Sequence, residues 1–551
     1  MQKKLLPSLA AAVLGAGLLV GASFASSAGG NAPAKPGSGE AKRGGTLRVN
    51  LSTTDFEYVD PALAYDAYGW GVLYMTNLML LNYPDKPAPE GSRLVPDAAV
   101  GFPRVSSDGK TYTFTLKSGL RFSDGSAVTA AAFKRAFERA ADPKQASPAI
   151  AFMHDVVGAD ARNEGKATSV SGISAKGLTL TIRLTVANPT FLAEIAMPFF
   201  AAVKPSMAVD SHGLNVYPSA GPYKIVSRSV GSQLVLERNT FYKGNRPANA
   251  DRIVITTNTD ENQSLLQVRA GQIDYDQFGL PPTAHDGLSS QYGVAKGGNG
   301  RYFVNTGINT TYLALNTSRP ALGKVNLRKA VNWAIDRPAM LRVAGKFAGK
   351  RTDQILPPNM QGFRDAKLYP IKGADVAKGR ELGGGAKDNI DLLYTTSPTS
   401  VARAQIIKYN LEQIGLSVTL KPQPFAVAIR TAGTRGSDFD IFLIAWFADY
   451  PDPYDFINVL LDGQNIQAAN NSNYSYLNSP KYNQLMTDAS KLSGAARYDA
   501  YGKLDVDMMK TVVPWVPLSN GNVREFISTR VTNYIFHPVY GGAIMNALAI
   551  K

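Results

Sequence analysis

One segment of the chain, Phe439 to Phe456, constrains the fold more than any other. Within it, Ile441 to Phe447 form an almost unbroken apolar run with the length of a buried strand. Pro451 and Pro453 follow and prevent the strand from continuing. Asp449 is therefore expected where a buried strand gives way to a loop, the usual place for a binding residue in an α/β protein. The alternative is an ordinary turn residue, because Asp beside Pro is common in loops.

Strand and helix patterns alternate along the chain, which predicts an α/β fold. In the strands, apolar and polar residues alternate, so each should bury one face. The predicted strands include residues 45–50, 111–116, 178–184 and 416–420. The helical patterns cover residues 129–140, 327–335 and 407–414. Thr129 is expected to cap the first helix and Gly415 to end the last.

Residues 1–28 have the pattern of a secretory signal peptide. Two lysines precede an apolar run that ends at Val20, and small residues follow, so cleavage is expected after Ala25 or Ala28. The apolar run is shorter than the ~20 residues of a membrane-spanning helix, which disfavours an uncleaved anchor. Residues 29–43 are rich in Gly, Pro and Ala and are expected to form a flexible leader.

The chain has 551 residues and no cysteine. This excludes disulfides, thiol catalysis and a lipid-modified cysteine, and a chain of this length can build its core without disulfides. We therefore expect a periplasmic or secreted protein. The formal charge of +15 falls to +13 without the two lysines of the signal, and no basic run of five or more residues occurs. The basic residues are scattered among acids, so no nucleic-acid partner is expected.

Sequence motifs for catalysis and metal binding are absent. The four histidines, at 154, 212, 285 and 537, are far apart and show no ligand spacing. We expect no metal, no cofactor and no catalytic residue. The acids Asp449, Asp452 and Asp455 keep a secreted hydrolase open as an alternative. Three acids so close together in a proline-rich loop are, however, expected to face solvent, with Asp452 a solvated loop residue.

A series of short segments runs through the mature chain in order. They are Gly44-Gly-Thr-Leu-Arg48, Asp108-Gly-Lys-Thr-Tyr-Thr-Phe-Thr-Leu-Lys-Ser-Gly-Leu-Arg-Phe-Ser-Asp-Gly125, Val128-Thr-Ala130, Ala220-Gly-Pro-Tyr223, Leu236-Glu-Arg-Asn239, Phe241-Tyr-Lys-Gly244, Ala270-Gly-Gln-Ile-Asp274, Leu315-Asn-Thr317, Leu327-Arg-Lys-Ala-Val331, Ala334-Ile-Asp-Arg337 and Trp446-Phe-Ala-Asp449-Tyr-Pro-Asp-Pro453. Together they resemble family 5 of the extracellular solute-binding proteins, the dipeptide and oligopeptide receptors of ABC importers. The order and spacing of the segments carry the resemblance, which covers nearly the whole mature chain.

The resemblance implies an α/β fold of the two-lobed, hinged, periplasmic-binding-protein type (type II), with an extra third domain. One lobe would combine residues 44–80, 201–310 and 515–551. The extra domain would be residues 81–200, and the second lobe residues 311–514. A ligand would bind between the lobes.

The resemblance also implies a binding site. In the peptide receptors, the Asp of the Trp-x-x-Asp segment pairs with the N-terminal ammonium of the ligand, and that position here is Asp449. Trp446 and Phe447 are candidate pocket walls, or else strand residues packed in the core. Tyr450, which follows Asp449 in this segment, is a further candidate ligand-binding residue. Arg435 lies near a position where some oligopeptide receptors place an arginine, but its spacing is off by one, and the alternative is a solvated loop residue.

The expected function is an extracytoplasmic receptor, not an enzyme, that captures peptides between two lobes and delivers them to the permease subunits of an ABC importer. The Ala-Asp-Tyr-Pro-Asp-Pro form of the segment does not prove a peptide ligand. A nickel chelate, haem, an opine or an oligosaccharide stays open, and the aromatic residues between Tyr58 and Tyr74 would suit a sugar. We expect a monomer.

Overall fold

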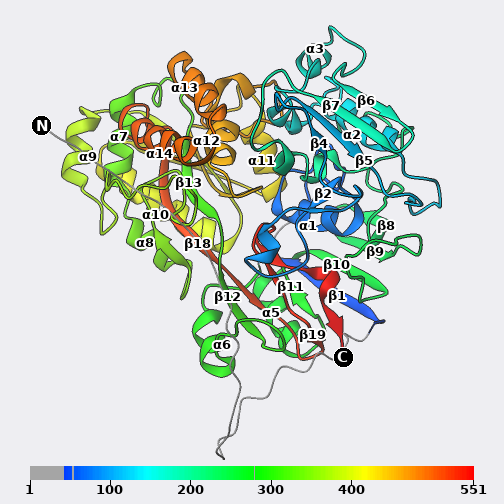
Figure 1. Ribbon diagram of the computed structural model, residues 1–551. Coiled ribbons are helices and arrows are strands. Elements are labelled where there is room, and N and C mark those ends of the chain that lie inside the picture. Colours follow the sequence, from blue (N-terminus) through cyan, green and yellow to red (C-terminus); the bar gives the residue numbers. More distant parts are fainter. Residues whose placement is uncertain (1–42, 53–54, 278) are drawn as a thin grey trace, which may run out of the picture. The chain divides into compact units, whose positions relative to one another are not determined.

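The computed structural model describes residues 43–52, 55–277 and 279–551 of the chain. The predicted signal peptide, and all but the last residue of the predicted leader, lie outside these ranges. Three large sheets organise the described residues (Figure 1).

The first sheet has five strands in the order β11-β1-β10-β9-β8. Their bounds are β1 Thr46–Ser52, β8 Tyr223–Ser229, β9 Gln233–Arg238, β10 Arg252–Thr259 and β11 Tyr275–Asp276. Strand β1 runs parallel to β10 and β11, whereas β8, β9 and β10 pair antiparallel. Leu47, Val49 and Leu51 of β1 are fully buried, because alternate residues of a strand face the same side. The predicted first strand is confirmed.

The second sheet has seven strands. Six follow the order β12-β18-β13-β17-β15-β16, and β14 also pairs with β18. Their bounds are β12 Tyr302–Thr306, β13 Asn309–Leu315, β14 Gly349–Arg351, β15 Asn389–Thr395, β16 Ser417–Gln423, β17 Ile441–Phe447 and β18 Trp515–Phe526. The sheet is mixed: β15 is parallel to β16 and β17, and the pairs on either side of β13 are antiparallel. The ring of Trp515 stacks on that of Tyr312 at 3.6 Å, which joins β18 to β13.

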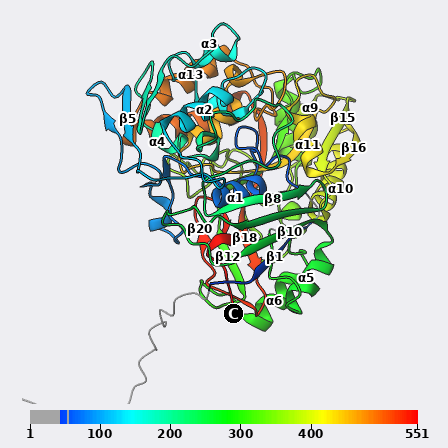
Figure 2. The ribbon, with the colours of Figure 1, turned by 90° about the vertical axis from the view of Figure 1, so that its right-hand side faces the viewer.

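The third sheet has four strands in the order β4-β5-β7-β6. Their bounds are β4 Arg104–Val105, β5 Thr111–Thr115, β6 Ile173–Lys176 and β7 Thr179–Arg183. The alternation seen in the sequence is confirmed: Phe114, Leu180 and Ile182 are fully buried, and their neighbours are partly or fully exposed. Helix α2 packs against this sheet, as both views show (Figures 1 and 2).

The helices surround these sheets. Their bounds are α1 Ala67–Thr76, α2 Ala130–Ala140, α3 Ala159–Asn163, α4 Phe191–Glu194, α5 Glu261–Arg269, α6 Ala284–Tyr292, α7 Val325–Ala334, α8 Arg337–Arg342, α9 Val376–Gly383, α10 Pro398–Gln413, α11 Phe425–Gly433, α12 Tyr454–Leu461, α13 Pro480–Ser490 and α14 Gly494–Thr511. Short 3-10 helices lie at Glu90–Ser92, Pro148–Phe152, Pro198–Phe200, Gly463–Asn465 and Met545–Ala547. Two-stranded pairs join β2 Leu81–Asn82 to β3 Val95–Pro96, β19 Val531–Thr532 to β22 Ala549–Ile550, and β20 Phe536–His537 to β21 Gly542–Ala543.

The predicted helices are present. Helix α7 buries Leu327, Ala330, Val331 and Ala334, the residues that share one helical face in the sequence. Helix α10 begins at Pro398, well before the predicted start, because Ser397 caps it through its side chain. Thr129 is the N-cap residue of α2, but its hydroxyl makes no capping hydrogen bond in the described part of the chain.

None of the helices formed by the described residues is both long enough and apolar enough to span a bilayer. The domain boundaries stay a prediction.

Candidate functional site

The site begins where strand β17 ends. The strand lies between β13 and β15 and covers the predicted residues, Ile441–Phe447. Asp449 follows two residues later, and helix α12 begins directly after Pro453. The predicted stop of the strand is therefore confirmed, and a sharp strand-to-helix turn carries the acids.

The expectation that these three acids face solvent is wrong. Asp449 is 8% exposed, Asp452 6% and Asp455 0%. Asp452, expected to be a solvated loop residue, instead pairs with Arg497 of α14 through two hydrogen bonds of 2.8 and 3.1 Å. No local pattern in the sequence indicates this pair, because its two members are far apart in the chain.

Asp455 holds the end of the strand in place. Its Oδ2 accepts hydrogen bonds from the indole N–H of Trp446 at 3.2 Å and from the backbone N–H of Asp449 at 3.0 Å. Burial raises the pKa of Asp455, and the nearby charge of Asp449 raises it further. Burial also raises the pKa of Asp449, although the Tyr65 hydroxyl, which donates to its Oδ2 at 2.6 Å, favours the ionised form. Asp455 is therefore the acid that keeps its proton, and Asp449 the one that ionises first.

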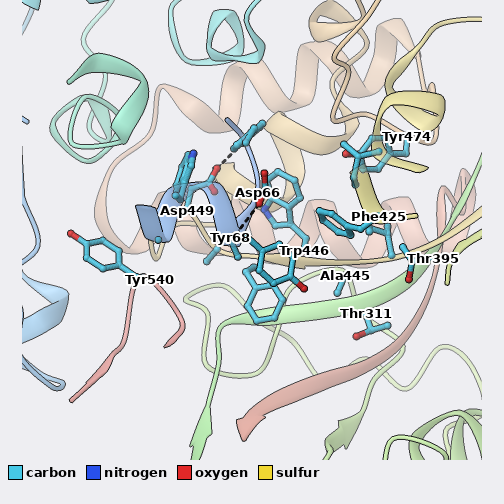
Figure 3. A pocket seen from close by; sticks show the side chains of 18 of the residues that line it. Asp66, Tyr68, Thr311, Thr395, Phe425, Ala445, Trp446, Asp449, Tyr474 and Tyr540 are labelled. Carbon is cyan, nitrogen blue, oxygen red and sulfur yellow. Dashed lines mark hydrogen bonds between the residues drawn. The ribbon is translucent and has the colours of Figure 1, made fainter. Parts of the chain in front are cut away.

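Asp449 lies in the wall of a pocket of about 300 Å³ (Figure 3). Aromatic rings form much of this wall: Tyr65, Tyr68, Trp70, Tyr74, Phe425, Trp446, Phe447, Tyr474 and Tyr540. In Figure 3, Asp449 and Tyr540 lie at one end of the pocket and Tyr474 and Thr395 at the other. The pocket is thus an aromatic-walled space with an acid at one end.

Helix α1 and the turn before it supply one wall. Asp66 caps the helix, because its Oδ1 accepts hydrogen bonds from the backbone N–H groups of Tyr68 and Gly69, both at 2.9 Å. Its Oδ2 is buried and has no hydrogen-bond partner among the described residues. The ring of Tyr65 packs edge-on against Trp446 at 5.2 Å, and that of Tyr68 against Phe425 at 5.4 Å. These contacts join the α1 side of the pocket to the side formed by β17 and α11.

A single arginine, Arg403 of α10, is the only basic side chain in the described lining of this pocket. Its Nε donates to the backbone oxygen of Met340 at 3.1 Å. Burial, assisted by nearby Arg524, lowers its pKa to about 10. No acidic side chain within the described ranges forms an ion pair with Arg403, so its charge is available to a ligand.

The structure brings together three of the five predicted site residues, because Asp449, Trp446 and Phe447 all line the pocket. Tyr450 is fully buried and directs its hydroxyl at Glu194, 3.5 Å away. Arg435 is exposed in the loop after α11. Neither belongs to the described lining of the pocket. The binding roles of all five stay predictions.

Sequence reasoning missed several residues of the pocket, among them Tyr65, Asp66, Arg403 and Tyr474. The aromatic residues between Tyr58 and Tyr74 are a local signal for this wall, since Tyr65, Trp70 and Tyr74 all line the pocket. Arg403 has no local signal, since nothing near it in the sequence differs from an ordinary helix surface. In the described part of the chain, no group of three or more His, Asp or Glu side chains could hold a metal ion.

The fold is that of the two-lobed solute-binding proteins. The solved structure of the Escherichia coli murein tripeptide binding protein MppA superposes with a TM-score of 0.80 at 23% identity, and covers 92% of this chain and 98% of that chain. The two-lobed α/β fold predicted from the sequence is thereby confirmed.

The chain belongs to the bacterial extracellular solute-binding proteins, family 5. The family model, described as the "family 5 Middle" region, matches residues 93–468. Among curated relatives, the oligopeptide-binding protein OppA of Bacillus subtilis is 26% identical over 475 residues, covering 82% of this chain and 83% of the relative. The probable D,D-dipeptide-binding periplasmic protein DdpA of Escherichia coli is 26% identical over 500 residues, covering 88% of this chain and 90% of the relative.

Proposed function

We propose that this protein is an extracytoplasmic receptor that captures short peptides in the aromatic pocket and delivers them to the permease of an ABC importer. The observation that carries the proposal is the buried carboxylate of Asp449 in the pocket wall. No cationic side chain of the described residues pairs with it. The relatives are named for binding oligopeptides, a D,D-dipeptide and a murein tripeptide. These names support a peptide as the ligand.

The free amine of the peptide is the partner we assign to Asp449. A carboxylate buried without a cation is unfavourable, and an ammonium placed against it forms a strong, charge-assisted hydrogen bond. The Tyr65 hydroxyl already donates to one oxygen of Asp449, so it holds the carboxylate in position for the ligand.

The carboxyl end of the peptide is the partner we assign to Arg403. The hydroxyls of Thr395 and Ser400 line the same pocket and can add hydrogen bonds there. A volume of about 300 Å³ is at the small end for ligand pockets. An acid and a base in so small a space favour a peptide of only a few residues.

Mass spectrometry of the ligand released by denaturing the purified protein tests this function directly. We expect a short peptide with an unmodified amine. Adding that peptide back at a hundred times its dissociation constant should stabilise the fold by about 2.7 kcal/mol, which a thermal melt detects. A released glycan, haem or metal chelate, together with no stabilisation by any peptide, would refute the peptide ligand but not the receptor.

The same experiment separates a receptor from a hydrolase. A receptor returns the added peptide with its mass unchanged after long incubation, whereas a hydrolase at catalytic concentration would convert it to fragments. We propose that the chain binds without catalysis. We also propose that a signal peptide over residues 1–28 is cleaved on export, which the N-terminal sequence of the mature protein would establish.

A further inference from the structure

A second, smaller cavity adjoins the aromatic pocket. It has a volume of about 20 Å³, and Tyr65, Ile429 and Tyr474 line both spaces. Its own lining adds Glu57, Tyr58 and the polar segment Asn470-Asn-Ser472. We call this space the annex. Its volume suits one water-sized group, and an ammonium head is about that size.

The annex contains a carboxyl group without a partner, that of Glu57. Glu57 forms no hydrogen bond and no ion pair with any residue that the structure describes, although it is largely buried. Burial raises its pKa to about 8, the charge of Asp66 raises it further, and Arg430 of α11 opposes the rise. Arg430 itself is exposed and lies too far away to form an ion pair with Glu57.

Two further features favour a positive charge in this place. The unpartnered Oδ2 of Asp66 belongs to the wall of the adjoining pocket, and Asp66 lies close enough to raise the pKa of Glu57, so a second acid is present on this side. The rings of Tyr65 and Tyr474 line both spaces, and cations bind favourably against aromatic faces. An alkyl chain with a cationic end matches both these rings and the acid.

We infer that the annex is a second cation subsite, in which Glu57 receives the charged end of a basic side chain of the ligand. This inference rests on the proposed peptide function and refines it, because it makes the receptor selective for short peptides that carry lysine or arginine. The first cation, the free amine of the peptide, stays at Asp449. The subsite at Glu57 then recognises the side chain of one particular residue of the peptide.

Matched tripeptides test the inference. In Ala-Ala-Ala, each alanine is replaced in turn by lysine or by norleucine, which has the same apolar stem without the charge. Titration calorimetry on the purified, ligand-stripped protein measures the affinity of each. At one position, the lysine peptide should bind about tenfold more tightly than the norleucine peptide, since it gains a charge-assisted contact. Glu57→Gln should reduce this ratio to about one.

Glu381→Gln, on the exposed surface of α9, is the matched control and should leave the ratio unchanged. A ratio of about one at every position of the wild-type protein, or a lysine preference that survives Glu57→Gln, would overturn the inference alone. If Glu57→Gln does not fold, the lysine and norleucine peptides still test the inference on the wild-type protein, where a ratio of about one would refute it. If no tripeptide binds at all, the proposed function fails and the inference fails with it.

Discussion

Asp449 and Asp455 are six residues apart and share one buried turn, but their surroundings give them different tasks. Asp455 accepts hydrogen bonds from the protein itself and keeps its proton, so it fixes the direction of the turn. Asp449 accepts a hydrogen bond from the hydroxyl of Tyr65 and lies in the pocket wall. Of these two acids, Asp449 is therefore the one that offers a charge to a ligand.

Replacing Asp449 by Asn should weaken peptide binding by about 2 to 5 kcal/mol, because the ligand's ammonium would be buried without its counter-charge. Acetylating the amine of the peptide should weaken binding to the wild-type protein by a similar amount. The two losses should not add, since both remove the same pair. Titration calorimetry with free and acetylated peptide on both proteins measures all four affinities.

Asp438→Asn is a suitable control for this experiment, because Asp438 is 68% exposed and forms only surface ion pairs. It should change the affinity by less than about 1 kcal/mol. Additive losses for Asp449→Asn and acetylation would show that Asp449 does not contact the amine.

Asp452 serves the stability of the fold and is not the solvated loop residue that the sequence predicted. Replacing it by Asn would leave the guanidinium of Arg497 buried without a counter-charge, which should lower the free energy of unfolding by about 3 to 5 kcal/mol. Denaturant unfolding measures the loss. Because Asp452 does not line the pocket, the peptide affinity of the folded fraction should hardly change; a large loss of affinity at full stability would contradict this assignment.

For single residues, the sequence predicted that Asp449 lies where a buried strand ends and a loop begins. That position follows from local patterns, the apolar run of the strand and the prolines after it. The sequence did not predict that the acids are buried, because contacts with distant parts of the chain bury them: Asp452 pairs with Arg497 of α14, and Asp449 accepts a hydrogen bond from Tyr65. Arg403 and Glu57 could not be predicted as site residues for a similar reason. The absence of an ion-pair partner can be recognised only in the folded structure.

Among the elements, helix α1 matters most for the pocket, because Tyr68, Trp70 and Tyr74 project from it into the wall. Its end is fixed by a close backbone contact. The N–H of Gly221 donates to the carbonyl of Thr76, the last residue of the helix, at 2.8 Å. A Cβ at position 221 would lie 2.5 Å from the carbonyl carbon of Thr76, so only glycine fits there.

Gly221→Ala should therefore push α1 out of place. We expect the free energy of unfolding to fall by about 1 to 3 kcal/mol, as for other overpacked sites, because backbone atoms cannot turn aside as a side chain can. Peptide binding should weaken as well, since the aromatic wall moves with the helix. Thermal melts and calorimetry on the same sample measure both effects.

Gly287→Ala, inside helix α6, is the matched control. A Cβ there would meet no atom within 4 Å. Alanine should raise the stability by about 0.5 to 1 kcal/mol, because it favours the helix. If Gly221→Ala proved equally harmless, the contact with Thr76 would not fix the helix.

Most single elements could be predicted from the sequence, because their hydrophobic periodicity is local. Strand β17 was predicted residue for residue, and the alternating strands β5 and β7 nearly so. Which strands pair could not be predicted in this way. The parallel pairing of β1 with β10 joins residues separated by some two hundred positions, and no local pattern encodes it. The two-lobed arrangement was predicted from the resemblance to family 5, because hydrophobic periodicity alone does not indicate how strands and helices assemble into lobes.

For the whole molecule, buried carboxyl groups make stability depend on pH. Asp505 of α14 is fully buried, and burial raises its pKa to about 7 despite hydrogen bonds from the backbone N–H groups of Ile355 and Leu356. Burial likewise raises the pKa of Glu194 to about 7. Between about pH 4 and about pH 7, such a carboxyl group is protonated in the folded protein but ionised in the unfolded chain. Its contribution to the free energy of unfolding therefore falls as the pH rises from about 4 to about 7.

Asp505→Asn isolates this contribution. The variant loses one acceptor at every pH, but it carries no charge to bury. Relative to the wild-type protein, its free energy of unfolding should therefore rise by about 2 kcal/mol between pH 5 and pH 8. Denaturant titrations of both proteins at pH 5, 6, 7 and 8 and constant ionic strength measure the difference. A difference that stays constant across this range would mean that Asp505 is ionised throughout.

Strand β18 has a consequence for the order in which the molecule can fold. Its residues, Trp515–Phe526, come late in the chain, yet they lie between β12 and β13, which end at Leu315. A chain that has been synthesised only to Pro514 leaves β12 without a neighbour and β13 with an open edge. The ends of a very long loop must then meet before the sheet can close, which makes this step slow. This sheet thus stays open until the residues of β18 have been synthesised.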